Sequence, residues 1–153
     1  MSVVILYGTE TGNSELVADA IADVLAADHD PSVYDMSEYA VEDLDPQDFV
    51  VIVCATYGEG ELPTGAEPFA EELDEVDPDL TGLRFAVFGL GDTIYGETFN
   101  RGGEIIAEML TKRGAVQVGE HSRHDNSSAV KPVKQAEEWA QTCLLYTSPS
   151  PRD

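Results

Sequence analysis

A short polar stretch near the amino terminus carries groups suited to binding an anion. It reads Thr9-Glu10-Thr11-Gly12-Asn13-Ser14 and lies between an apolar run at 3–7 and a segment with helical apolar spacing. At such a strand-to-helix turn, free backbone N–H groups and the positive end of the helix dipole converge. No Lys or Arg precedes Arg84, so backbone and hydroxyl donors alone would hold the anion. The alternative is that Thr, Asn and Ser only cap the helix.

Two further stretches combine glycines with a tyrosine directly after an apolar run. Glycine lets the backbone approach a ligand closely, and two tyrosine faces can enclose a planar ring. Together with the anion loop, these stretches predict a site for a flat ring with a phosphate tail. Either tyrosine alone would be interpreted as a partly exposed turn residue. The first stretch reads Thr56-Tyr57-Gly58-Glu59-Gly60, and the second reads Leu90-Gly91-Asp92, followed by Tyr95 and by Phe99-Asn100.

The elements that must position these loops alternate along the chain. Strands alternating with helices are typical of a parallel α/β sheet wound on both faces, which binds ligands beyond the carboxyl ends of its strands. The acidic segment 36–48 is predicted to be a loop with at most a short helical turn. The predicted strands are 3–7, 32–35, 49–55, 85–89 and 115–118, and the predicted helices are 13–27, 66–76, 101–113 and 130–141.

Length and composition limit the class of protein. A chain of 153 residues with 42% hydrophobic residues fits one domain. The net charge of −22 argues against nucleic acid or an anionic membrane as partner, and permits a basic protein partner or a role in solubility. We find no apolar run of transmembrane length and no signal peptide, and expect a cytoplasmic location. Cys54 and Cys143 suggest no disulfide framework, and Cys54 is predicted to lie in the core.

These three loops, in this order and at this spacing, resemble the flavodoxin family over residues 2–142. The resemblance implies a five-stranded parallel sheet of order 2-1-3-4-5 in a three-layer sandwich, with noncovalently bound FMN. It also implies a monomeric, low-potential one-electron carrier. Such a carrier receives electrons from a flavodoxin reductase or similar donor and delivers them to an acceptor redox enzyme. The short segment between the fifth strand and the last helix is similar to that of short-chain members.

The resemblance also implies a role for individual residues. Thr9, Thr11, Asn13 and Ser14 correspond to phosphate ligands, together with the backbone of Glu10 and Gly12. Tyr57 and Tyr95 correspond to the aromatic residues that cover the two ring faces, and Gly58 to the peptide that turns on reduction. No catalytic or metal-binding residue is expected. The remaining expected FMN contacts are Thr56, Glu59, Gly60, Leu90, Gly91, Asp92, Phe99 and Asn100.

The sequence departs from the family pattern in two respects. Many relatives have cysteine where this chain has Asn100, and the stretch 95–100 is one residue longer than in many of them. The segment 121–128 is predicted to be a loop, from which Asp125 approaches the ring edge. Residues 1–142 are expected to form the FMN-binding domain. Residues 143–153 contain two prolines and resemble translated sequencing-adaptor sequence, with a native disordered tail as the alternative.

Three other functions are compatible with parts of the pattern. An FMN-dependent NAD(P)H:quinone oxidoreductase has a similar fold, but such relatives carry insertions that this chain lacks. A detached FMN domain of a diflavin reductase is favoured by the form of 56–60, whereas Met1 directly before the first strand favours a stand-alone carrier. A response-regulator module would need a phosphoacceptor Asp after the third strand, where this chain reads Ala55-Thr56-Tyr57, so we set it aside.

Overall fold

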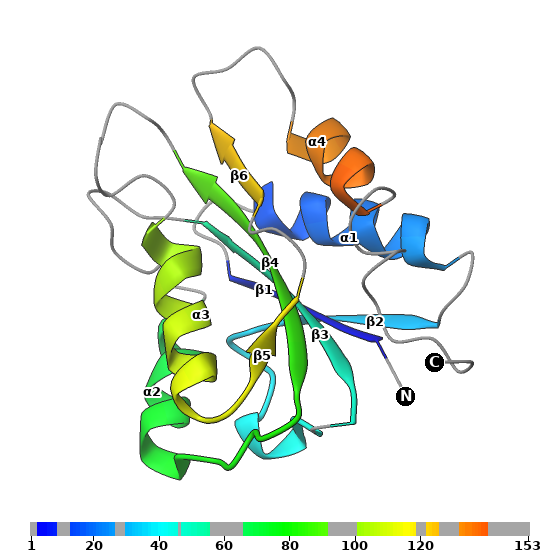
Figure 1. The fold of residues 1–153 in the computed structure, drawn as a ribbon. Helices are drawn as coiled ribbons and strands as arrows, with labels where there is room; N and C mark the ends of the chain where they lie inside the picture. The colour runs from blue at the N-terminus through cyan, green and yellow to red at the C-terminus, as the bar shows by residue number, and fades with distance from the viewer. Residues whose placement is uncertain are drawn as a thin grey trace.

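The computed structural model describes residues 3–8, 13–26, 30–45, 47–55, 66–91, 101–118, 122–125 and 132–140. They form a parallel sheet with helices on both faces (Figure 1). The strands are β1 (Val3–Gly8), β2 (Pro31–Asp35), β3 (Phe49–Ala55), β4 (Arg84–Gly91), β5 (Val116–Gln117) and β6 (Ser122–Asp125). The helices are α1 (Asn13–Leu25), α2 (Glu67–Val76), α3 (Arg101–Lys112) and α4 (Pro132–Trp139), with a short 3-10 helix η1 (Val41–Asp43) in the acidic segment.

The order of the strands confirms the predicted fold class. Neighbouring strands run in the order β2-β1-β3-β4-β5, and every pair is parallel. The predicted helices are all present and differ from expectation by at most two residues at either end. The single helical turn expected in 36–48 is η1. Helical and apolar periodicity therefore located the elements that carry the loops.

The outer strand position beside β4 is shared by two short strands. β5 pairs with the beginning of β4, at Arg84, whereas β6 pairs with its end, where Gly91 lies opposite Asp125. The prediction of a loop at 121–128 was therefore wrong for residues 122–125. The error has a physical reason, because this strand reads Ser-Arg-His-Asp and its pairing rests on backbone hydrogen bonds, which leave no apolar pattern to recognise.

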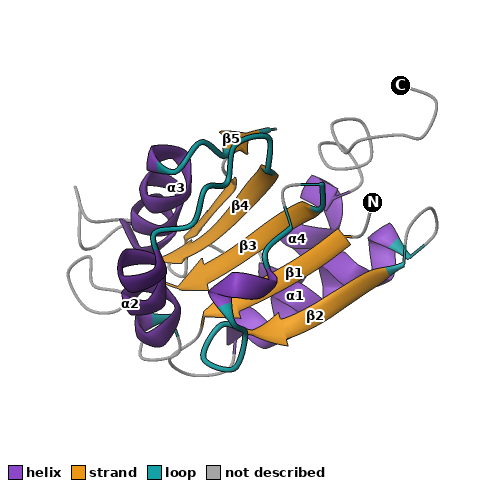
Figure 2. Ribbon diagram, turned by 90° about the horizontal axis from the view of Figure 1, so that it is seen from below, coloured by secondary structure: helices purple, strands orange, loops and turns teal. Residues whose placement is uncertain are grey.

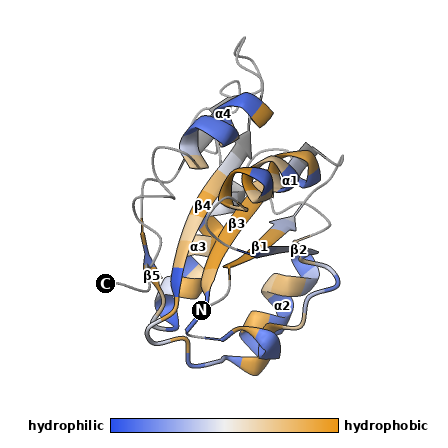
Figure 3. Cartoon of the chain, turned by 90° about the vertical axis from the view of Figure 1, so that its right-hand side faces the viewer, coloured by the Kyte–Doolittle hydropathy of each residue, from blue (hydrophilic) through white to orange (hydrophobic). Residues whose placement is uncertain are grey.

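Two apolar clusters lie on opposite faces of the sheet, because side chains alternate along each strand (Figure 2). On one face, Ile5 and Val51 pack with α1 and α4, where the rings of Phe88 and Trp139 lie 5.5 Å apart. On the other face, Leu6 and neighbouring side chains pack with α2, α3 and η1. Figure 3 shows the hydrophobic central strands between these helical layers. This three-layer packing fixes the strand ends from which the loops start.

The prediction that Cys54 lies in the core is confirmed. Its side chain is fully buried in β3 and forms no disulfide bond. Burial raises the pKa of its thiol to about 12, because the thiolate would lose its hydration. Within the described ranges, we find no helix with the length and apolar character needed to cross a membrane.

Candidate functional site

The carboxyl ends of three central strands lie side by side. Gly8 of β1 is opposite Cys54 of β3, and Ala55 is opposite Leu90 of β4. The three polar stretches of the sequence each begin within a residue or two of these positions, so they leave the sheet at one common edge. In doubly wound sheets this edge is where ligands bind. The strand order therefore places the start of all three predicted loops at the carboxyl edge of the sheet.

Most of the predicted FMN contacts lie outside the described residues, and their contacts stay predictions. The structure describes the backbone of Asn13, Leu90 and Gly91, and both the backbone and the side chain of Ser14. The predicted residues outside the described ranges are Thr9, Glu10, Thr11, Gly12, Thr56, Tyr57, Gly58, Glu59, Gly60, Asp92, Tyr95, Phe99 and Asn100.

Ser14 is a buried polar residue at the start of α1. Its side chain is 0% exposed, and its Oγ has no hydrogen-bond partner among the described residues. A buried hydroxyl left without a partner costs about 1–3 kcal/mol. Asn13 and Ser14 also form the first turn of the helix, where backbone N–H groups are free to bind an anion. An oxygen-rich anion at this turn would satisfy the Ser14 hydroxyl and the N–H groups together.

Gly8 allows two chain segments to meet behind this turn. A Cβ atom at Gly8 would lie 2.7 Å from the Cβ of Ala66 and 3.1 Å from the Sδ of Met36. Ala66 directly precedes α2, so the absence of a side chain at Gly8 lets the chain after the second polar stretch return close to the end of β1. Sequence reasoning missed Gly8, although a glycine at the end of an apolar run was a visible signal.

Tyr7 connects the end of β1 to the first turn of α1. Its hydroxyl donates a hydrogen bond to Glu15 Oε2 over 3.1 Å, which spans the stretch 9–12. The pKa of Tyr7 is raised to about 12, first by burial and then by the hydrogen bond and charge of Glu15. The phenol therefore remains a neutral donor through the physiological range. This contact was also missed, since tyrosine and glutamate at this spacing carry no distinctive pattern.

The end of β4 brings one further predicted residue to the same edge. Gly91 lies opposite Asp125 of β6, and Leu90 lies opposite His124. The backbone of Asp125 is thus beside the start of the third polar stretch. A contact between its carboxylate and a ligand stays a prediction. No set of three or more His, Cys, Asp or Glu side chains in the described ranges could hold a metal ion.

Comparison with known sequences gives consistent matches. A family model described as Flavodoxin matches residues 5–139. The flavodoxin of Trichodesmium erythraeum is 37% identical over 136 residues, which covers 85% of this chain and 78% of that protein. The NADPH–cytochrome P450 reductase of Rattus norvegicus is 34% identical over 125 residues. That match covers 78% of this chain, which spans only 18% of the reductase.

Solved structures agree with the sequence matches. A cysteine-to-alanine mutant of flavodoxin from Pseudomonas aeruginosa superimposes with a TM-score of 0.82 at 33% identity, covering 92% of this chain and 95% of that one. Oxidised flavodoxin 2 from Bacillus cereus gives a TM-score of 0.80 at 34% identity, with 92% and 96% covered. Sequence, strand order and overall superposition therefore point to the same group of proteins.

Proposed function

Because the chain belongs to the flavodoxin family, we propose that it is a low-potential one-electron carrier that binds FMN at the carboxyl edge of its sheet. Members of this family are FMN-binding electron carriers, so the predicted family, cofactor and class of function are confirmed. The observation that supports the placement of FMN is Ser14. Its buried hydroxyl lacks a partner among the described residues, and a phosphate oxygen is a strong acceptor for it.

The residues proposed to hold FMN are those that the family pattern matches. Thr9, Thr11, Asn13 and Ser14 bind the phosphate, and Tyr57 and Tyr95 enclose the ring. When bound, FMN supplies the electron-transfer chemistry, and the protein binds it, orients it and shields it from water. The neighbouring carboxylates of the polar stretches disfavour added negative charge, which supports a low potential for the second electron.

The proposed partners are a flavodoxin reductase or similar electron donor and an acceptor redox enzyme. The net charge of −22 supports basic partners, because opposite charge accelerates the encounter of two proteins. Helix α2, which follows the second polar stretch, carries exposed Glu67, Glu71 and Glu75. This face is the proposed docking region for the reductase. We propose a monomer in the cytoplasm, in keeping with a cysteine in β3 that forms no disulfide.

A second candidate is an FMN module that receives electrons within a larger reductase assembly. The 34% identity to the amino-acid sequence of a P450 reductase over 125 residues favours it. The two functions differ in the protein that reduces the chain. A stand-alone carrier accepts electrons from a separate ferredoxin- or flavodoxin-type reductase supplied in solution, whereas the module receives them within its assembly.

A third outcome is NADPH oxidation by the chain alone, with no added reductase, which would support the quinone oxidoreductase alternative.

The experiment that tests the proposed function is a spectrum of the purified chain followed by a reductive titration. We expect a yellow protein with one FMN per chain, released by acid, and a lower potential for the second electron than for the first. Replacing Gly12 with Val should abolish FMN binding, because the new side chain crowds the phosphate cradle. A folded wild-type chain that is colourless and takes up no added FMN would rule the proposal out.

A further inference from the structure

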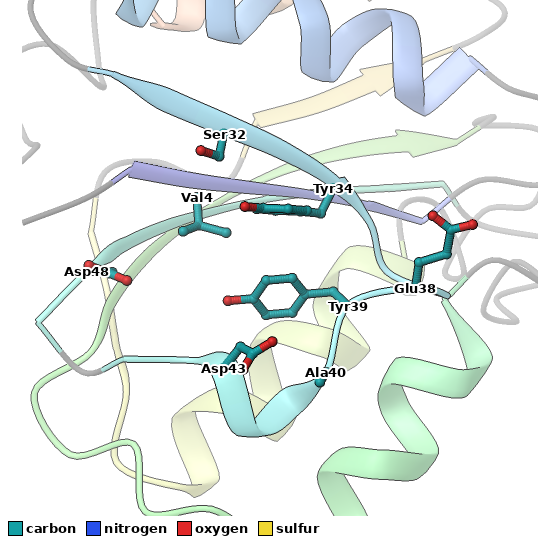
Figure 4. A pocket seen from close by; sticks show the side chains of 8 residues that line it. All are labelled: Val4, Ser32, Tyr34, Glu38, Tyr39, Ala40, Asp43 and Asp48. Atoms are coloured by element: carbon teal, nitrogen blue, oxygen red, sulfur yellow. The ribbon is translucent and has the colours of Figure 1, made fainter.

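A cavity of about 430 Å³ lies beside β2, between one face of the sheet and the segment that carries η1 (Figure 4). None of the described residues that line it belongs to the expected FMN-binding set. Its volume falls in the range that holds a small organic molecule, roughly 300–1,000 Å³. It is lined by Val4, Ser32, Tyr34, Glu38, Tyr39, Ala40, Asp43 and Asp48.

Two tyrosine rings form the aromatic part of the cavity. The ring centroids of Tyr34 and Tyr39 lie 5.1 Å apart, and the ring planes are inclined by 50°. Tyr39 packs against the apolar cluster on this face of the sheet, whereas Tyr34 is 44% exposed. In Figure 4 the hydroxyl ends of both rings point toward the side where Asp48 lies. The faces of such rings attract cations, because the π-electrons give them negative potential.

All the described charged residues that line the cavity are acidic. They are Glu38, Asp43 and Asp48, and no described lining residue is Lys, Arg or His. The pKa of Tyr39 is raised to about 12, first by burial and next by the charges of Asp43 and Asp48. The phenol therefore stays neutral, and the two carboxylates are close enough to act on it. This charge pattern disfavours an anionic ligand and favours a cationic one.

The walls of the cavity are held in place by contacts within the protein. The backbone N–H of Val41 donates to Glu72 Oε1 over 2.5 Å, which fixes η1 against α2. Val41 and Leu44 are buried in the core on either side of Asp43. In the turn between Tyr34 and Glu38, the N–H and the hydroxyl of Ser37 both donate to Asp35 Oδ1 over 2.8 Å. A preformed site loses little conformational entropy on binding.

We propose that this cavity binds a small organic cation, with its ammonium or guanidinium group near Asp43 and Asp48 and its apolar body against the rings of Tyr34 and Tyr39. An inorganic cation would make no use of the apolar ring surface. A neutral polar ligand would make no use of the three carboxylates. The described residues that line the cavity belong to none of the three polar stretches that follow β1, β3 and β4, so binding here does not use the proposed FMN contacts.

A binding titration with a defined probe tests this proposal. The probe is N-butylguanidine, and its uncharged counterpart of the same shape is N-butylurea. Both are added to the full-length protein, with its FMN as purified, in KCl of constant ionic strength at about 0.15 M, where nonspecific attraction is screened. We expect saturable shifts of the backbone amide signals of residues 34–48 with the cation and none with the urea. Equal binding of both compounds would overturn the proposal.

Paired variants separate a site from general acidity. Asp43→Asn/Asp48→Asn should weaken binding of the cation about five-fold or more, since two ion contacts are lost. Asp19→Asn/Asp23→Asn makes the same change of charge at exposed positions of α1. This pair should alter the affinity for the cation by less than about two-fold. Equal weakening by the two pairs would leave only net charge and overturn the proposal.

The aromatic part is tested separately. Tyr34→Leu removes one exposed ring without opening the core, and should weaken binding about three-fold, a loss typical of an exposed cation–π contact. Unchanged binding in a folded Tyr34→Leu protein would contradict the role of the rings. Binding of an arginine-containing peptide, without binding of N-butylguanidine, would overturn the small-molecule site in favour of a protein partner.

Discussion

Two buried polar side chains at opposite ends of the sheet differ in how they are satisfied. At the amino end, the side chain of Arg113 is only 6% exposed, and its NH1 donates to the carbonyl oxygen of Met109 over 2.9 Å. Its NH2 lies 3.1 Å from a carboxylate oxygen of Asp74. Its Nε lies 3.1 Å from a carboxylate oxygen of Asp77, in an ion pair whose geometry is not that of a hydrogen bond. At the carboxyl end, the Ser14 hydroxyl has no partner of either kind among the described residues. A buried polar group partnered by the chain supports the fold, whereas an unsatisfied one indicates a ligand.

The two ends also differ in what the chain places there. Arg113 joins the end of α3 to the end of α2, and its backbone oxygen accepts from the N–H of Leu80 over 2.9 Å. These contacts hold together the segments that lead into β4 and β5. Ser14, in contrast, lies in the first turn of α1, which follows the carboxyl end of β1 and the first polar stretch. We therefore expect substitutions at the amino end to change stability alone, and those at the carboxyl end to change FMN affinity.

The largest effect is expected at Gly8. A Cβ atom there would lie 2.7 Å from the Cβ and 3.3 Å from the Cα of Ala66, so backbone must shift. Gly8→Val should lower the free energy of unfolding by about 3 kcal/mol, the upper end for overpacking, and weaken FMN binding in any folded fraction. Urea unfolding and FMN titration measure both. Gly82→Ala is the control, since nothing lies within 4 Å of its Cβ position; its φ of +94° predicts a loss of stability with FMN affinity unchanged.

The second largest effect is expected at Ser14, and it tests the contrast between Ser14 and Arg113 most directly. Ser14→Ala removes the unsatisfied hydroxyl, so the FMN-free protein should be as stable as the original or slightly more so. The affinity for FMN should fall about 10- to 100-fold, because a hydrogen bond to a charged phosphate is worth about 1.5–3 kcal/mol. Riboflavin, which lacks the phosphate, should bind both proteins equally. An equal loss of affinity for riboflavin and FMN would contradict a phosphate contact.

Arg113 should behave in the opposite way. Arg113→Met keeps much of the apolar stem but loses the contacts with Met109, Asp74 and Asp77, and should lower stability by about 1–2 kcal/mol. FMN affinity should not change. Lys112→Met is the matched control, because Lys112 is exposed and carries the same charge. If Arg113→Met weakened FMN binding as much as Ser14→Ala does, the division between the two ends would be wrong.

The smallest effect is expected at Tyr7, whose hydroxyl bonds Glu15 near the surface. Tyr7→Phe should cost less than about 1 kcal/mol at neutral pH. The folded pKa of about 12 exceeds the ordinary value of 10.0, so the contribution of Tyr7 is complete below pH 10 and disappears as the pH rises through 12. The free energy of unfolding should therefore fall less steeply between pH 10 and 12 in Tyr7→Phe than in the original chain. Identical slopes would contradict this assignment.

Local patterns in the sequence predicted the elements because periodicity reports which face of a strand or helix is buried. The apolar run 49–55 is β3 as predicted, and the helix expected at 66–76 is α2 with its start moved by one residue. The strand at 122–125 could not be found this way, since its pairing with β4 depends on the backbone.

Contacts between distant residues were beyond the same reasoning. Arg113 and Asp74 are 39 positions apart, and the approach of Gly8 to Ala66 spans an even longer stretch of chain. The cavity beside β2 likewise needs β1, β2 and η1 in place at once. Of the candidate site, the sequence predicted the edge of the sheet from which the three loops start and the turn that we propose binds the phosphate. It did not reveal which hydroxyl would be buried, because burial depends on how α1 packs on the sheet.

Burial makes the Cys54 thiol resistant to oxidation and disulfide exchange. Its thiol lies in β3, one residue from the end of the strand and beside Gly8 and Gly89 of the neighbouring strands. Disulfide exchange and oxidation need the thiolate, and a pKa of about 12 leaves roughly one thiolate in a hundred thousand at pH 7. Full burial also denies access to oxidants. A protein with the proposed carrier function would thus keep a sulfur atom close to the carboxyl edge of its sheet without forming mixed disulfides or crosslinked dimers.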